Sequence, residues 1–467
     1  MKIKKLMGAM AIAALASVTF SVNASSIDAT TARNMANSFI KQHSGTTQSA
    51  FKAPVALADI KLAHVEASKV CGNAYYVFNI QGGGWVIVAG DDRAKQVLAY
   101  GDKGNLDMNE LPGSMKDYLN LYKNQIEEMQ SYKGEVVPLK APKRVTPVAP
   151  LTKSTWGQSE PMNRMCPMKG SDICSVGCGP LAMAQIVYYW KYPAGCDGMS
   201  SYYVYGGCGS VPALEATTFD YSLMLDKYTV YNPNTGGVSL GTYTEEQANE
   251  VAKLSRYCGH ACNTRYGNSG TSSGSYTYDQ RDAFKLFGYN DIKLLGIDPS
   301  WYCDNNVRYT EDEWKALISV ELEAGRPVAY HNVDFIDGHA WVLDGVDADG
   351  KFHMNWGFYE RFDGWFEFGA FTIYPNGETW NFNGTGNEMV VNIIPYEGYV
   401  IPGDEPQGVI PGDVTGDQDV TIKDVTELIN LLMKSAEYNE AGDVNHDGKN
   451  TITDITMLIN YLMTGAW

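Results

Sequence analysis

A cysteine between two glycines, at the start of an apolar helix, constrains this chain more than any other stretch. Residues 175–190 run SVGCGPLAMAQIVYYW, so that Gly177 and Gly179 flank Cys178. Pro180 suits a first helical turn, because its fixed φ is already helical and its missing N–H would have no helical partner there. The Ala, Leu, Met and Gln that follow are good helix formers. The pattern predicts a helix with the cysteine at its N-terminus.

The thiol of Cys178 is a candidate nucleophile. At a helix N-terminus it faces unpaired backbone N–H groups and the positive end of the helix dipole, which favour the thiolate. The neighbouring glycines allow a substrate backbone to approach the sulfur. The alternative that this stretch leaves open is a buried structural cysteine, since free cysteine is among the most buried residue types.

Four other residues complete a hydrolytic arrangement. His339 precedes an apolar strand and lies beyond Cys178 in the order and rough spacing of papain-type enzymes, so it is the candidate proton acceptor. Asn355 supplies an amide to orient the imidazole and Trp356 an indole to exclude water from it. Gln158 precedes the cysteine and is the candidate side-chain donor to the oxyanion. Taken singly, His339 could be a core histidine and Gln158 a surface residue.

Composition limits the class of protein. A length of 467 residues predicts more than one domain, and a 44% hydrophobic share is enough for proper cores. The formal net charge of −18 argues against a nucleic-acid partner.

The first 24 residues have the pattern of a signal peptide. A lysine-rich start is followed by an apolar, alanine-rich run and by small residues at Val22-Asn23-Ala24. No later apolar stretch is long enough to span a membrane. The protein is therefore predicted to be secreted.

Nine cysteines leave at least one thiol unpaired in an exported protein, and the sequence does not fix their pairing. Cys258 and Cys262 flank His260 in the manner of a metal knuckle, but no second ligand pair follows at zinc-finger spacing.

Residues 25–144 are expected to form a separate α+β unit. The patterns predict, in order, a helix at 31–41, a hairpin of 75–80 and 85–89, a third strand at 97–100 and an amphipathic helix at 112–133. An exposed basic segment with a proline follows, and we predict proteolytic cleavage between about Lys140 and Val148.

Residues 145–397 form the next unit, and residues 398–411, with three prolines, form a linker. After the cysteine helix come predicted helices at 280–287 and 310–324, and then strands at 327–331, 339–343 and 351–356. A helical half with the cysteine and a β half with the histidine would meet at a cleft.

Residues 412–467 contain a repeat with a period of 30 residues. The sequence GDVTGD recurs as GDVNHD, so that Asp413 corresponds to Asp443. Each copy precedes an apolar helix. Calcium prefers oxygen ligands, which such loops offer at fixed positions. The predicted ligands are Asp413, Thr415, Asp417, Asp419, Thr421 and Asp424 in the first loop, and Asp443, Asn445, Asp447, Thr451 and Asp454 in the second. An Asp at the last ligand position, with no entering helix, resembles a dockerin.

The central unit resembles the streptopain family of papain-like cysteine peptidases. The motifs that carry this resemblance are PL at 150–151, WGQ at 156–158, PMN at 161–163, GC at 177–178, AMAQI at 182–186, GHA at 338–340, LDG at 343–345 and NWG at 355–357. The resemblance implies a two-part α+β catalytic domain with a helical half and an antiparallel β half. It also implies Cys178 as nucleophile, His339 as its proton partner, Gln158 at the oxyanion and Trp356 as a shield, with Asn355 beside it.

The loop 266–274 is similar to the family's substrate-cleft loop, which implies that Ser272 and Gly338 lie near bound peptide. Two departures from the family stand out. Gly179-Pro180 follows the cysteine, and residues 358–364 replace a glycine-rich turn, so the resemblance leaves the shape of the cleft open.

Residues 75–112 resemble the streptopain prosegment, which implies that this region inhibits its own enzyme. The resemblance of the C-terminal unit to a dockerin implies a small all-α calcium-binding module that docks to a cohesin-like partner.

These observations predict a secreted cysteine endopeptidase, made as a zymogen, with structural calcium in its docking module and no cofactor for catalysis. Two alternatives remain open at this stage. One is an inactive binding or inhibitor protein on a peptidase fold. The other is a papain-like amidase or acyltransferase that uses the same dyad.

Overall fold

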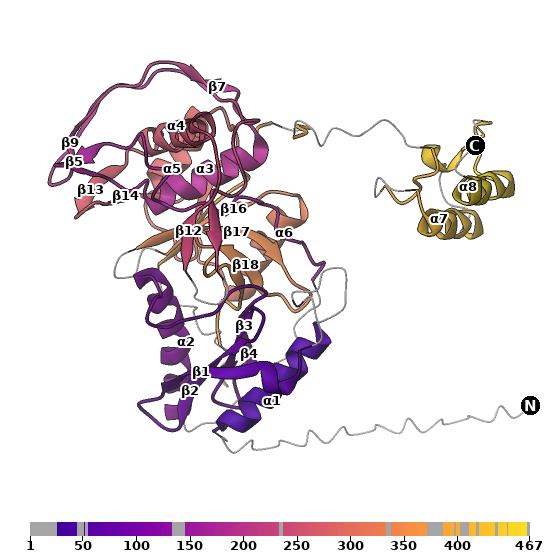
Figure 1. The fold of residues 1–467 in the computed structure, drawn as a ribbon, viewed down its shortest axis with the longest axis horizontal. Coiled ribbons are helices and arrows are strands. Elements are labelled where there is room, and N and C mark those ends of the chain that lie inside the picture. The colour runs from indigo at the N-terminus through magenta and orange to yellow at the C-terminus, as the bar shows by residue number, and fades with distance from the viewer. Residues whose placement is uncertain are drawn as a thin grey trace, which may run out of the picture. The chain divides into compact units, whose positions relative to one another are not determined.

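A computed structural model describes residues 26–43, 51, 55–132, 145–232, 237–332, 338–370, 386–396, 398–401, 411–416, 420–434, 438–445 and 447–464. They belong to two compact units, Met1–Glu397 and Gly398–Trp467 (Figure 1). The predicted signal peptide, most of the predicted linker and the cleavage segment up to residue 144 lie outside the described residues, as do Asp417 and Asp419.

A ten-stranded antiparallel sheet forms the centre of the first unit. Its strands, in spatial order, are β1 (Ile60–Ala67), β2 (Asn73–Ile80), β3 (Trp85–Ala89), β4 (Val97–Gly101), β19 (Gly364–Phe366), β18 (Phe352–Asn355), β17 (His339–Val346), β16 (Val328–Asn332), β20 (Asn387–Val391) and β15 (Lys293–Gly296).

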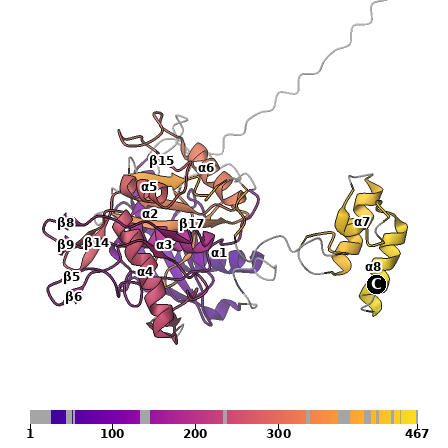
Figure 2. The same cartoon turned by 90° about the horizontal axis from the view of Figure 1, so that it is seen from above.

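Six α-helices accompany this sheet. They are α1 (Ala29–Gln42), α2 (Gly113–Ser131), α3 (Cys178–Trp190), α4 (Glu245–Ala261), α5 (Thr277–Leu286) and α6 (Glu311–Glu323), with a 3-10 turn at Leu57–Asp59. Helix α3 packs against α4 and α5 (Figure 2).

Five two-stranded sheets form the loop-rich part. They pair β5 (Met168–Lys169) with β6 (Asp172–Ile173), β7 (Gly195–Cys196) with β10 (Thr217–Thr218), β8 (Tyr202–Val204) with β9 (Gly209–Val211), β11 (Thr229–Tyr231) with β12 (Val238–Leu240), and β13 (Arg265–Ser269) with β14 (Ser272–Gly274).

The sheet runs without a break from residues 26–132, the predicted prosegment region, into residues 145–396, the predicted peptidase region. Strand β4 pairs with β19, with Tyr100 opposite Trp365. Sequence analysis expects the first region to be a unit of its own, whereas the structure shows the two sharing one sheet. Pairing covers the polar edges that both sheets would otherwise expose. Figure 1 shows the indigo elements of the prosegment region at one end of this unit and α3, α4 and α5 at the other.

Alternate residues of the strands pack on opposite faces of the sheet. In β2, Tyr76 and Phe78 join the core under α1, while Tyr75 and Val77 join the core under α2. The α2 core is continuous with the one under α6 in the peptidase region. The prosegment region is therefore held by a shared hydrophobic core as well as by the shared sheet.

Most predicted elements are present with shifts of a few residues at their ends, and the predicted α+β class is confirmed. Helix α4 was not predicted, although Thr244 caps it and forms a capping box with Gln247. Strand β1 was also not predicted. The short strands β19 and β20 were missed because short runs are specified by their neighbours rather than by their own pattern.

The second unit contains helices α7 (Ile422–Met433) and α8 (Ile452–Thr464), and a 3-10 turn at Glu440–Gly442. Its buried apolar core consists of Val414, Val425, Leu428 and Leu458. In neither unit does a described helix have the length and apolar character needed to cross a membrane.

Candidate active site

Cys178 is the first residue of α3, as predicted, and is half-buried. Gly177 before it has a φ of 94°, a conformation that favours glycine. A Cβ on Gly177 would lie 3.2 Å from the carbonyl oxygen of Ser273. The cysteine therefore follows a sharp turn that strand β14 holds from outside.

Burial raises the pKa of the Cys178 thiol. The backbone groups of Ala340 and Gly179 lower it, as expected at a helix N-terminus, but burial outweighs them. The contact with Ala340 places the sulfur beside the residue that follows His339. Helix α3 and strand β17 thus bring together the two residues that sequence analysis proposed as a dyad.

The Nε2 atom of His339 faces a backbone carbonyl. It lies 3.1 Å from the carbonyl oxygen of Trp356, and no hydrogen bond joins the described side chains of His339 and Cys178. Burial lowers the pKa of His339 to about 4, despite the raising effect of the Trp356 carbonyl. At neutral pH the histidine is therefore neutral, and the thiolate–imidazolium pair is not assembled in this conformation.

Aromatic rings hold His339 in this orientation. Its ring stacks on Phe358, with centroids 5.3 Å apart and planes 5° apart, and it lies 6.0 Å from the Trp356 ring. Tyr118, on α2 of the prosegment region, meets the Trp356 ring edge-on at 5.4 Å. Trp356 is 1% exposed. The prosegment region therefore contacts the indole that packs against the histidine.

The amide of Asn355 lies elsewhere than expected. Its Nδ2 donates to the carbonyl oxygen of Ser154 at 2.8 Å and to Oε1 of Gln185 at 3.1 Å, so it does not orient the imidazole here. The register of β17 and β18 gives the reason, because Asn355 lies opposite Val342 rather than His339. Asn355 instead ties the loop before Gln158 to helix α3.

Gln158 lies beside the cysteine turn. Its carbonyl oxygen accepts the N–H of Val176 at 3.0 Å. The loop 358–364, which departs from the family pattern, packs on this segment. Its Tyr359 ring would be 2.3 Å from a Cβ on Gly157, and its hydroxyl accepts the N–H of Ser159 at 3.0 Å. Tyr359 therefore packs against the residues on both sides of Gln158.

Ser272 is exposed on β14, and its hairpin lines the cysteine turn. The N–H of Ser175 donates to Thr271 O at 2.9 Å, and Ser175 Oγ accepts from Ser273 N at 3.1 Å. Gly338 has a φ of 55°, and no atom lies within 4 Å of where its Cβ would be. Sequence analysis placed Gly338 near bound peptide, and the positive φ is what favours glycine at this position.

Sequence analysis missed three residues around this site. Phe358 stacks on His339, and its only signal was its place in the divergent loop. Gln280 and His331 form a buried hydrogen-bond chain to Gly179, described below. They lie 51 residues apart, and no local pattern links them.

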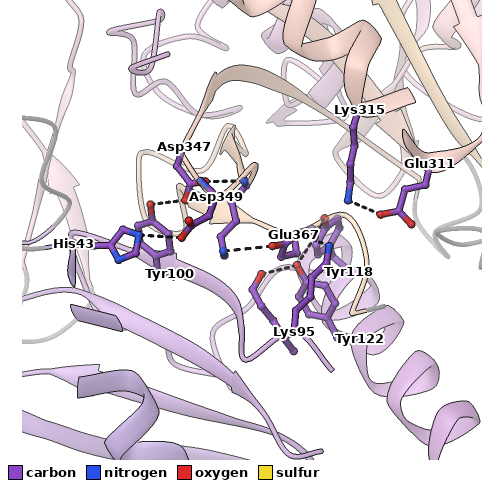
Figure 3. Close-up of polar contacts among 12 residues, drawn as sticks. His43, Lys95, Tyr100, Tyr118, Tyr122, Glu311, Lys315, Asp347, Asp349 and Glu367 are labelled. Carbon is purple, nitrogen blue, oxygen red and sulfur yellow. Dashed lines mark hydrogen bonds and ion pairs between the residues drawn. The ribbon is translucent and has the colours of Figure 1, made fainter. Parts of the chain in front are cut away.

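Two buried charge clusters join the prosegment region to the peptidase region (Figure 3). In the first, Glu367 lies 2.6 Å from the Lys95 ammonium and 3.4 Å from that of Lys351, while Tyr118 donates to its carbonyl oxygen at 2.8 Å. Burial by itself raises the pKa of Glu367. The charges of the nearby lysines lower this pKa by more, so that the net shift is downward.

In the second cluster, Tyr100 donates to Asp347 Oδ2 at 2.9 Å. His43, at the end of α1, lies with Nε2 3.1 Å from Oδ2 of Asp349. Figure 3 shows the tyrosine and the histidine pointing at the same turn between β17 and β18. The Tyr100–Asp347 contact is buried, so removing either partner leaves a polar group uncompensated, whereas the Asp349 side chain is 44% exposed.

In the second unit, both loops bury their first and last aspartates. Asp413 and Asp424 are 8% and 0% exposed, and Asp443 and Asp454 are 2% and 0% exposed. Asp424 accepts from Thr415 Oγ1 at 2.8 Å, and Asp454 from Thr451 Oγ1 at 2.9 Å. Paired carboxylates buried in a short loop are the donor set that Ca²⁺ prefers.

A cysteine turn on a helix N-terminus, facing a histidine-bearing β half, is the architecture of papain-like cysteine peptidases. Residues 156–366 match the Peptidase C10 family, residues 24–126 the Spi protease inhibitor, and residues 411–463 the Dockerin type I domain. The chain therefore contains a region similar to the Peptidase C10 family, together with regions similar to an inhibitor-type prosegment and to a dockerin domain.

Known relatives agree with this assignment. Streptopain of Streptococcus pyogenes is 29% identical over 353 residues, which are 71% of this chain and 84% of that protein. Thiol protease/hemagglutinin PrtT of Porphyromonas gingivalis is 27% identical over 61% of this chain and 32% of its own length. A prointerpain A fragment from Prevotella intermedia, 25% identical, matches 71% of this chain and 97% of that structure, with a TM-score of 0.56.

Proposed function

We propose that this chain is the secreted precursor of a cysteine endopeptidase in which Cys178 attacks the peptide carbonyl. The observation that carries the proposal is the contact of the Cys178 sulfur with the backbone of Ala340, next to His339. The thiolate would form an acyl-enzyme, His339 would protonate the leaving amine, and water activated by His339 would release the acid. The N–H of Cys178 and the side chain of Gln158 would stabilise the oxyanion.

Selective labelling tests this role. One equivalent of iodoacetamide added to the self-processed enzyme should label Cys178 much faster than the seven other cysteines that remain in it, as read by peptide mass spectrometry. Equal labelling of Cys178 and the half-buried Cys303 would instead favour an inactive binding protein on this fold.

We infer that the prosegment keeps the enzyme latent by holding His339 against the Trp356 carbonyl. Tyr118 supports the Trp356 ring from behind, and the lowered pKa of His339 disfavours the imidazolium that a thiolate needs. Departure of α2 would free the indole and allow the imidazole to turn toward the sulfur. The signal peptide and maturation between about Lys140 and Val148 belong to the same proposal. An active secreted enzyme whose N-terminus lies near residue 25 would contradict it.

Prosegment binding is expected to weaken as the pH rises above neutrality. His43 Nδ1 lies 2.9 Å from the Phe39 carbonyl and Nε2 faces Asp349, so only the doubly protonated ring donates to both. Burial lowers the pKa of His43, but these hydrogen bonds and the charges of Asp349 and Asp347 raise it overall. The contribution of His43 to prosegment binding is therefore fully present below the ordinary histidine pKa of about 6.5. It is lost as the pH rises through the raised pKa of the bound state.

Amide hydrogen exchange of β4 and β19 measures this in the full chain carrying Cys178→Ala. After correction for intrinsic exchange rates, the protection of these amides should fall between pH 5.5 and pH 8.5. The fall should be about threefold to tenfold larger in this chain than in a chain that also carries His43→Gln. His64→Gln is the matched control, because His64 pairs with Glu66 inside the prosegment at 3.0 Å. An equal pH effect with and without His43 would contradict the prediction.

For the second unit, we propose that the two loops bind calcium. The ligands would come from Asp413, Thr415, Asp417, Asp419, Thr421 and Asp424, and from Asp443, Asn445, Asp447, Thr451 and Asp454. The exposed apolar residues Ile422 and Met433 of α7, and Ile452 and Met463 of α8, offer a surface for a cohesin-like module. Docking would place the peptidase on an extracellular or cell-surface assembly.

A further inference from the structure

A buried chain of hydrogen bonds reaches the nucleophile turn from behind. Nε2 of His331, on β16, lies 2.6 Å from Oε1 of Gln280, on α5. Nε2 of Gln280 donates to the carbonyl oxygen of Gly179 at 2.6 Å. Gln280 is 0% exposed and His331 4%, so water does not compete for these groups. Gly179 directly follows Cys178.

His331 and His339 point to opposite faces of the sheet. In the register of β16 and β17, His331 lies opposite Ala340, and Asn332 lies opposite His339. Neighbouring residues of a strand alternate between faces. His331 therefore faces helix α3 together with Ala340, whereas His339 lies on the face of Trp341. The two histidines have separate roles.

The hydrogen-bond chain has one consistent proton arrangement. The Gly179 carbonyl only accepts, so the Gln280 amide nitrogen must face it and the amide oxygen must accept from His331. Burial lowers the pKa of His331 to about 3, and the charge of His339 lowers it as well. His331 is therefore neutral, with its proton on Nε2. It is a fixed donor that does not titrate with the dyad.

Gly179 needs an external anchor because it has no side chain to limit its backbone. The structure shows why glycine is required, since a Cβ would lie 2.5 Å from Ser275 Oγ. That hydroxyl is buried and has no hydrogen-bond partner among the described residues. The backbone N–H of Gly179 in turn favours the thiolate form of Cys178. The orientation of the Gly179 backbone therefore affects the reactivity of the sulfur.

We propose that Gln280 and His331 are positioning residues that anchor the carbonyl group of Gly179 and so fix the Gly179 backbone, whose N–H is directed at the Cys178 sulfur. The proposal rests on the proposed role of Cys178 as nucleophile. Neither residue touches substrate. They act by holding the turn in the geometry in which the thiolate is stabilised.

The Gln280→Glu variant tests this directly, because it keeps length and shape but replaces the donor to Gly179 with an acceptor. In the self-processed enzyme it should lower kcat/KM by about tenfold to a hundredfold, the cost of a misplaced catalytic group. The pH midpoint for alkylation of Cys178, followed by peptide mass spectrometry, should rise. Gln280→Ala should show a smaller change in the same direction.

Tyr330→Phe is the matched control. It removes one buried hydrogen bond, which Trp314 Nε1 donates to the Tyr330 hydroxyl at 2.9 Å. Tyr330 is one residue from His331 in β16 and lies on the opposite face of the sheet. It should leave the alkylation midpoint unchanged, so that a general loss of stability is separated from positioning. If Gln280→Glu does not fold, His331→Asn provides the second variant.

The proposal is overturned if the parent enzyme is active and the variants at Gln280 and His331 keep its alkylation midpoint, or change it no more than Tyr330→Phe does. If the parent itself shows no preferred labelling of Cys178, the proposed nucleophile is wrong instead. The two failures are therefore distinguishable.

Discussion

Replacing Cys178 by alanine is expected to abolish both self-processing and casein cleavage. The thiolate would be the only atom that bonds to substrate, and loss of a nucleophile costs at least about a thousandfold in kcat. The full-length chain should accumulate with its prosegment attached, as seen by intact mass. Casein hydrolysis should fall to background under conditions in which the parent enzyme is active.

Cys303→Ala is the matched control, because Cys303 is another half-buried cysteine of the same unit. It should process itself and cleave casein as the parent does. A Cys178→Ala chain that still matured on its own and digested casein would rule out the assigned nucleophile. Cleavage by a contaminating serine protease or metalloprotease must first be excluded with inhibitors of those classes.

Asp454→Ala is expected to remove one of two bound calcium ions and to destabilise the second unit strongly. Asp454 is fully buried, and among the described residues of this unit the core cluster has four buried apolar side chains. Calcium at a hundred times its Kd contributes about 2.7 kcal/mol per site. At about 4–8 °C per kcal/mol for a domain of this size, the unfolding temperature of the unit should fall by about 10–20 °C.

Calorimetry of the full chain with calcium, and titration of bound calcium, measure this effect. Glu427→Gln removes a carboxylate from α7 outside the loops and should leave two ions bound. The chelator EGTA should reproduce the effect of losing the ions, while casein cleavage by the first unit stays within about twofold. An unfolding temperature that is the same with EGTA and with calcium would contradict the calcium sites.

The parts of the site that sequence could predict are local. Residues 177–190 carry their own start signal, and helix α3 begins at Cys178 as expected. The loop pattern after Asp413 and Asp443 specifies buried aspartates within about a dozen residues. Such features depend on residues close together in the chain.

The details of the dyad could not be predicted in the same way. A helix N-terminus favours a thiolate, but burial of Cys178 reverses the sign of the pKa shift. Asn355 was expected at the imidazole, yet the register of two strands places it opposite Val342. Both outcomes depend on the surroundings that other segments supply.

The sequence by itself therefore determined the turn at Cys178, the strand that begins at His339, and the paired aspartates of each loop, because these are set by neighbours along the chain. Only the tertiary structure decided that one sheet joins prosegment and peptidase and that His339 turns to Trp356. It alone also decided that Gln280 and His331 meet behind Gly179. Those arrangements arise from strand pairing and burial between distant segments, whose free energies no local pattern contains.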